Sequence, residues 1–125
     1  MGIFSFSEKT KDVPWIRMIG ADQLEELFEK DGRPKLVFKH STRCSISSMA
    51  LSRFEKEWNQ ANNCDLYFLD LLAHRPISDL IAQRSEIQHQ SPQVIVLIDG
   101  EVIYHSSHNG ISANEIGNII QKLQQ

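Results

Sequence analysis

Short apolar runs alternate along this chain with segments whose apolar residues recur at helical spacing. The runs at 36–38, 66–69 and 94–98 have the length of buried strands and lack the polar alternation of a half-exposed strand. The segments between them, 44–60 and 76–87, carry apolar side chains three or four residues apart, as one face of a helix does. In the first segment the inner face is expected to include Ile46, Met49, Ala50, Phe54 and Trp58. This alternation predicts an α/β domain in which helices cover a largely buried sheet.

Several residues predict where the helices begin. Asp22 with Glu25, and Ser112 with Glu115, have the spacing of a capping box, in which two side chains satisfy free amides at a helix start. Apolar residues at helical spacing follow each pair. Pro76 suits the first turn of the helix that follows the run at 66–69.

A two-residue turn, Asp99-Gly100, is expected to join the run at 94–98 to an antiparallel strand at 102–104, because such hairpin turns need positive φ. A short first strand is expected at 15–19. The resulting order is β-α-β-α-β-α-β-β-α. Right-handed crossovers between parallel strands, followed by a hairpin and a helix, predict a mixed central sheet with helices on both faces. Thioredoxin-like folds have this order.

Length and composition fit a single domain. A chain of 125 residues, 41% hydrophobic and 23% charged, can bury a core without disulfides. We treat 1–125 as one domain, in which the polar residues 1–13 are expected to be a loosely ordered N-terminus. The net charge of -3 and the scattered basic residues argue against a nucleic-acid surface. No apolar run approaches the roughly 20 residues of a membrane helix, and no secretory signal is evident, so we expect a cytoplasmic protein with no membrane partner.

Cys44 lies where the strand that runs toward His40 is expected to lead into a helix. The free amides and the dipole of a helix N-terminus favour a thiolate over a thiol. Arg43 is adjacent, and His40 lies just upstream, so we expect both to add positive charge near the sulfur. Because the thiolate is the nucleophile of disulfide exchange, Cys44 is the candidate catalytic residue.

The pattern Cys44-Ser45-Ile46-Ser47 has serine where a C-x-x-C motif has its second, resolving cysteine. Ser47 cannot resolve a mixed disulfide, but it is expected to lie near the sulfur and to hydrogen-bond it. Cys64 is an improbable substitute, because a helix over 44–60 spans about 24 Å and a disulfide needs Cα atoms within about 7 Å. We therefore expect a monothiol protein whose adduct waits for an outside thiol.

Pro92 follows Ser91 and comes just before the strand at 94–98. A proline here needs an explanation, because it donates no hydrogen bond to a sheet. In thioredoxin-like folds a cis-proline at this place lies beside the catalytic cysteine, and the backbone of the preceding residue pairs with the substrate. We predict a cis Ser91–Pro92 bond close to Cys44; a trans proline that begins a strand is the alternative.

Other polar residues point less clearly to a site. His105 and His108 are three residues apart on an expected strand, where they would face opposite sides, and no third ligand stands at a recognised spacing. We therefore predict no metal site. His40, His74 and His89 are expected to be surface or cap residues.

Two blocks of this sequence resemble the YtxJ-like monothiol bacilliredoxins: the one from Lys39 to Ser47 and the one from His89 to Gln93. The resemblance implies a thioredoxin fold and removal of bacillithiol, a small cysteine-containing thiol, from proteins with which it has formed mixed disulfides. It also implies bacillithiol as a co-substrate with no other cofactor, and bacillithiolated proteins, a low-molecular-weight thiol and a reductase as partners.

Carried over residue by residue, the resemblance makes Cys44 the nucleophile that accepts bacillithiol. The family commonly has proline where this chain has Ser45, a change that loosens the first helical turn and restores a donor near the sulfur. The substrate-binding residues that we expect are Thr42, Arg43, Ser45, Ser47, Ser91 and Pro92.

Two other functions stay open at this point. Monothiol glutaredoxin-like proteins can share an iron–sulfur cluster between subunits, with one cysteine from each. The chain could also be a stress or adaptor domain that keeps the fold without the catalysis.

Overall fold

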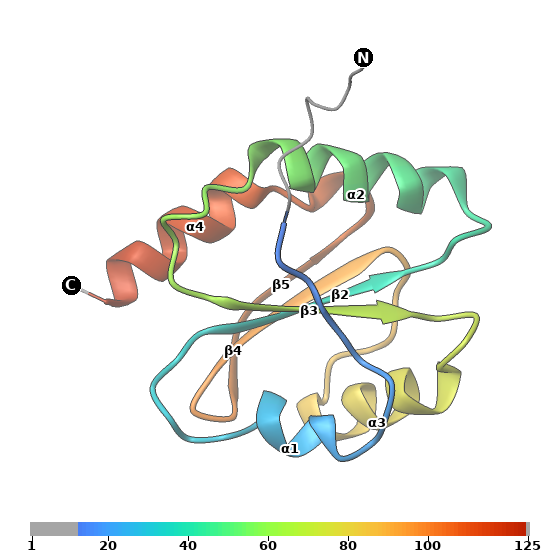
Figure 1. The fold of residues 1–125 in the computed structure, drawn as a ribbon, viewed down its shortest axis with the longest axis horizontal. Helices are drawn as coiled ribbons and strands as arrows, with labels where there is room; N and C mark the ends of the chain where they lie inside the picture. Colours follow the sequence, from blue (N-terminus) through green and yellow to red (C-terminus); the bar gives the residue numbers. More distant parts are fainter. Residues whose placement is uncertain (1–12, 125) are drawn as a thin grey trace.

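The structure, a computed structural model, describes residues 13–124 as a five-stranded sheet with helices on both faces (Figure 1). The elements in chain order are β1 (Ile16–Arg17), α1 (Gln23–Leu27), β2 (Lys35–His40), α2 (Ser45–Glu57), β3 (Asp65–Asp70), α3 (Arg75–Ser85), β4 (Gln93–Ile98), β5 (Glu101–Ser107), the 3-10 turn η1 (His108–Gly110) and α4 (Ala113–Leu123). This is the thioredoxin-like order that the sequence predicts. The strand expected at 15–19 is shorter, with two residues.

The strands lie in the order β1-β3-β2-β4-β5. The first three of these are mutually parallel, whereas β4 runs antiparallel to β2, and β5 antiparallel to β4. In Figure 1, α2 and α4 cover one face of the sheet, and α1 and α3 cover the other. The carboxyl ends of β2 and β3 therefore lie side by side at one edge, and the start of β4 lies at that same edge.

Two hydrophobic cores, one on each face, hold the helices to the sheet. Successive residues of a strand point to opposite faces, so β2 and β4 supply both cores and read as unbroken apolar runs. The core under α2 and α4 includes Leu36, Phe38, Ala50, Phe54, Trp58, Val94, Val96, Ile116 and Ile120. The core under α1 and α3 includes Leu24, Leu27, Val37, Leu69, Ile77, Ile81, Ile95 and Leu97.

The buried face of α2 differs in part from the expected one. Ala50, Phe54 and Trp58 are buried as predicted, but Ile46 is 50% exposed and Met49 is 68% exposed. At 3.6 residues per turn the buried side chains Ser47, Ala50 and Phe54 share one face of α2, and Met49 lies far from it. Ile46, although four residues before Ala50, lies at the margin of that face in the first turn of the helix. Two apolar side chains are consequently left in solvent on the first turns of α2.

One expected helix cap forms in part and the other does not. The Ser112 Oγ accepts a hydrogen bond from the Glu115 amide at 3.2 Å, but the Glu115 carboxylate accepts from the Tyr104 hydroxyl at 2.7 Å. Asp22 has helical backbone angles and no side-chain cap bond, so the prediction that it caps α1 is wrong. The Gln23 Oε1 lies in this region instead and accepts from the Ile19 amide.

The hairpin turn is confirmed: φ is 53° at Asp99 and 79° at Gly100. The Asp99 carboxylate also accepts a hydrogen bond from the Gly32 amide at 2.8 Å, which ties this turn to the loop before β2. Of the N-terminal segment expected to be loosely ordered, residues 1–12 lie outside the described residues, and Val13 packs against the core under α2. Within 13–124, no helix has the length and apolar character needed to cross a membrane.

Candidate functional site

Cys44 is the N-cap residue of α2 and lies at the point where β2 leads into that helix, as predicted. Its backbone is extended, with φ −108° and ψ 119°, and its carbonyl oxygen accepts the first helical hydrogen bond, from the Ser48 amide at 3.0 Å. The Cys44 amide donates to the Ser41 carbonyl at 3.2 Å, which closes a tight turn after β2. The residue is half-buried, so it is partly open to solvent in front of the free amides of the first helical turn.

The neighbours of Cys44 in sequence form an exposed surface around it. Thr42 and Arg43 occupy the turn before it, and Ser45 and Ile46 begin α2; all four side chains are exposed. Thr42, Arg43 and Ser45 can therefore reach a bound substrate, as their expected role requires. That role itself stays a prediction.

The Ser91–Pro92 peptide bond is cis, which confirms the predicted isomer. Lys39 of β2 pairs with Gln93 of β4 in antiparallel register, so Pro92 and Ser91 continue opposite the end of β2. The turn to Cys44 leaves the sheet at this same end. Pro92 is buried, and its carbonyl oxygen accepts from the His108 amide at 3.1 Å. The topology thus brings together two parts of the site that are far apart in the sequence.

Ser47 has a different place from the one expected. It is fully buried, its Oγ lies 2.7 Å from the His40 Nδ1, and it accepts a hydrogen bond from the Ser41 amide at 3.1 Å. The hydroxyl is thus engaged with the end of β2 rather than with the Cys44 sulfur. Without exposed surface, Ser47 cannot line a substrate site; it instead holds the first turn of α2 against the strand before the turn to Cys44.

His40 is also buried, and the expectation that it is a surface or cap residue is wrong. Its ring lies 5.5 Å from that of Phe68 and 6.5 Å from that of Phe38, between centroids. Burial lowers the pKa of His40, so the imidazole is neutral at pH 7. His40 therefore adds no positive charge beside Cys44, and the expectation that it does is wrong.

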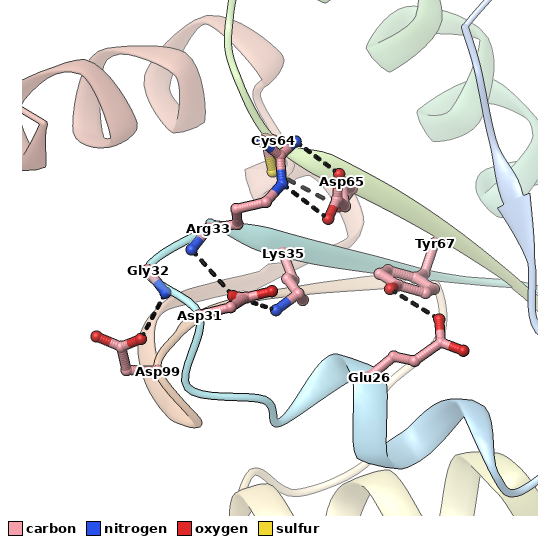
Figure 2. Close-up of polar contacts among 9 residues, drawn as sticks. All are labelled: Glu26, Asp31, Gly32, Arg33, Lys35, Cys64, Asp65, Tyr67 and Asp99. Atoms are coloured by element: carbon pink, nitrogen blue, oxygen red, sulfur yellow. Dashed lines mark hydrogen bonds and ion pairs between the residues drawn. The ribbon is translucent and has the colours of Figure 1, made fainter.

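Cys64 lies just before β3, next to Asp65 and Arg33 (Figure 2). Cys44 comes after the other end of β2, so the two cysteines lie at opposite ends of the sheet. Since β2 and β3 are parallel and six residues long, about 20 Å of strand separates the two ends. The Cys64 Sγ is half-buried near Asp65, and burial raises the pKa of this thiol to about 12. Both cysteines are free. Cys64 is therefore a protonated thiol far from the site, in agreement with the expectation that it does not resolve a mixed disulfide on Cys44.

The sequence did not reveal three polar residues behind the site. Lys39 and Gln93 are buried at 0% and 1% exposure, and His89, expected at the surface, is half-buried. The Lys39 Nζ lies 3.3 Å from the His89 Nδ1. A lysine directly after the apolar run at 36–38 was the one available signal. Among residues 13–124, no three His, Cys, Asp or Glu side chains gather as they would around a metal ion.

The comparison with known families gives this geometry a context. Residues 17–116 match a family model described as "Monothiol bacilliredoxin BrxC". The chain belongs to the monothiol bacilliredoxin family. The match includes Cys44, the turn before it, and the cis-proline.

Solved structures agree on the fold. A proposed oxidoreductase with a thioredoxin fold is 30% identical, with a TM-score of 0.72 over 83% of this chain and 91% of that chain. Thioredoxin from Malassezia sympodialis (TM-score 0.64, 16% identity, 90% of this chain and 92% of that one) and thioredoxin O2 from Arabidopsis thaliana (TM-score 0.65, 10% identity, 89% and 95%) share the fold alone. Family and fold together support a thiol–disulfide redox function.

Proposed function

We propose that this protein removes bacillithiol from mixed disulfides on other proteins, with Cys44 as its single catalytic thiol. The observation that carries the proposal is the placement of a partly exposed cysteine at the N-terminus of α2, at the sheet edge where the register places the cis Ser91–Pro92 bond. Family membership supports bacillithiol as the small thiol and the cytoplasm as the compartment.

The exchange step conserves sulfur–sulfur bonds. The Cys44 thiolate attacks the bacillithiol sulfur of the mixed disulfide in line with the S–S bond. A bond forms between Cys44 and bacillithiol, the original bond breaks, and the target cysteine leaves as a thiolate that takes a proton from water. A second thiol, from free bacillithiol or a reductase, then attacks the Cys44 adduct and regenerates the thiolate. No metal or organic cofactor takes part in this scheme.

The adduct must be resolved from outside the chain. Ser47, at the position of a resolving cysteine, is buried and hydrogen-bonded to His40. Cys64 is distant, and its pKa of about 12 leaves almost no thiolate at neutral pH. Neither residue can displace bacillithiol from Cys44, so a monothiol cycle follows.

The surface beside Cys44 suits a protein as the substrate. Ile46 and Met49 expose apolar side chains on the first turns of α2, next to the polar side chains of Thr42, Arg43 and Ser45. Exposed apolar groups beside a nucleophile favour contact with a polypeptide over a small polar thiol alone. We infer that a target segment lies across this surface and pairs with the Ser91 backbone.

The test is the release of the target thiol from a bacillithiolated protein of known sequence. The wild-type protein should release it, Cys44→Ser should release none, and the matched variant Cys64→Ser should keep nearly full activity. The same target carrying glutathione tests the choice of small thiol. Release by Cys44→Ser at the wild-type rate would refute the proposal. Visible absorbance after anaerobic purification would favour the iron–sulfur alternative instead.

A further inference from the structure

Two buried polar residues face each other across the sheet next to the site. Lys39 of β2 and Gln93 of β4 are register partners, so their side chains lie on the same face, the one covered by α3. Both side chains are almost completely buried, and polar side chains are seldom buried to this extent unless they form hydrogen bonds. Neither residue touches the surface around Cys44, so the exchange step as described does not use them.

Gln93 holds the loop at 86–92 by two backbone groups. Its Nε2 donates to the Gln88 carbonyl at 3.0 Å, and its Oε1 accepts from the Gln90 amide at 3.3 Å. Both halves of the side-chain amide are thus engaged with the segment that leads directly into the Ser91–Pro92 bond. A side chain on a rigid strand thereby fixes the path of a loop.

Lys39 holds the same loop through His89, the residue between Gln88 and Gln90. Its Nζ lies 3.3 Å from the His89 Nδ1 and 3.4 Å from the Ser78 carbonyl oxygen. Burial lowers the pKa of His89, so its neutral ring can accept a hydrogen bond from the lysine ammonium. The Ser78 Oγ also lies near this ring, 3.2 Å from the His89 Nδ1.

The charged groups around Lys39 do not explain its burial. Asp79 and Arg75, both on α3, act on it electrostatically in opposite senses, and burial is the largest influence on its pKa, which falls to about 8. Among residues 13–124, no carboxylate forms an ion pair with the Lys39 Nζ at contact distance. A buried cation without such a partner costs stability, so its benefit must lie elsewhere.

We propose that Lys39 and Gln93 are positioning residues that hold the loop at 86–92 so that the Ser91–Pro92 backbone stands ready to receive the substrate beside Cys44. This inference rests on the proposed function. The two side chains contact Gln88, His89 and Gln90, the three residues directly before that backbone. A preset loop lowers the ordering cost of binding, so its loss should weaken substrate binding without altering the sulfur.

The experiment compares two buried lysines at opposite ends of β2. Lys39→Met removes the contact with the loop, and Lys35→Met is the matched control, since Lys35 is only 2% exposed and bonds Asp31 instead. For each variant we would measure KM and kcat for a bacillithiolated protein, the alkylation rate of Cys44 by iodoacetamide, and the hydrogen exchange of the amides at 88–91.

Lys39→Met should raise KM about tenfold and speed amide exchange at 88–91 by about tenfold, with alkylation of Cys44 within about twofold of wild type. Lys39→Arg should recover part of the loss, and Gln93→Leu should repeat the pattern of Lys39→Met, which covers the case in which one variant fails to fold. Lys35→Met should leave KM and loop exchange unchanged.

Unchanged KM and unchanged loop exchange in both Lys39→Met and Gln93→Leu would overturn the inference. A fall of about tenfold in the alkylation rate of Cys44 in these variants would also overturn the inference, because the two residues would then act on the sulfur. If the wild-type protein releases no target thiol at all, the proposed function fails by itself. The hydrogen-exchange measurement still decides whether the two side chains hold the loop.

Discussion

Replacing Lys39 with methionine should make the folded protein more stable at pH 7, although it removes a hydrogen bond. Lys39 is fully buried, and burial lowers its pKa from 10.5 to about 8. The folded protein therefore binds this proton less tightly than the unfolded chain does. Methionine has a similar length and no charge, and Ser78 Oγ remains near the His89 Nδ1 as a partner.

The expected gain follows from the difference between the two pKa values. Each unit is worth about 1.4 kcal/mol, so keeping Lys39 protonated in the folded state costs about 3 kcal/mol. The cost is complete below about pH 8, where both states hold the proton. It declines as the pH rises from about 8 to about 10.5, and it vanishes above that range. The advantage of Lys39→Met over wild type should decline in the same way.

Urea unfolding of both proteins at pH 7 and at pH 10 measures this difference. We expect Lys39→Met to be more stable by up to about 3 kcal/mol at pH 7, and by much less at pH 10. Lys35→Met should show no gain at pH 7, because it removes a lysine paired with Asp31 at 2.7 Å. A destabilised Lys39→Met at pH 7, or a gain that is equal at the two pH values, would refute the reasoning. Greater global stability together with faster loop exchange would identify a residue kept for positioning.

Three further experiments test the fold and the second cysteine. Ser112→Ala should lower the free energy of unfolding in urea by about 1 kcal/mol, because the Glu115 amide loses its hydrogen-bond acceptor. An unchanged free energy of unfolding would mean that this cap does not stabilise α4. Gly117→Ala should lower the melting temperature, since a Cβ there would lie 2.5 Å from the Asn62 Nδ2, and adding Asn62→Ala should restore part of it. Cys64, with a pKa of about 12, should react with iodoacetamide at pH 8 far more slowly than Cys44 by peptide mass analysis; equal rates would contradict its assigned environment.

The fold could be predicted because three of its strands, β2, β3 and β4, are largely buried on both faces. The runs at 36–38, 66–69 and 94–98 lie in β2, β3 and β4, and turns and helices follow where the period changes. Cys44 was located by the same change, from a strand pattern to a helical one. Pro92 stood out because a proline needs a reason at the start of a buried strand.

The parts that could not be predicted depend on contacts between distant residues. Lys39 lies 39 residues from Ser78 and 50 from His89, so no local pattern indicates that it is buried with them. Ile46 and Met49 fit one reading of the helical period, and only the packing of α2 on the sheet shows them exposed.

The central claim is that Cys44 takes bacillithiol from a protein, and mass spectrometry can observe the adduct directly. The protein would be mixed briefly with a bacillithiolated target, quenched in acid and measured intact, and the modified cysteine would then be located by peptide mapping. We predict one bacillithiol on Cys44 in the wild-type protein and none in Cys44→Ser. An adduct on Cys64, or an unmodified protein beside a fully bacillithiolated target, would contradict the claim.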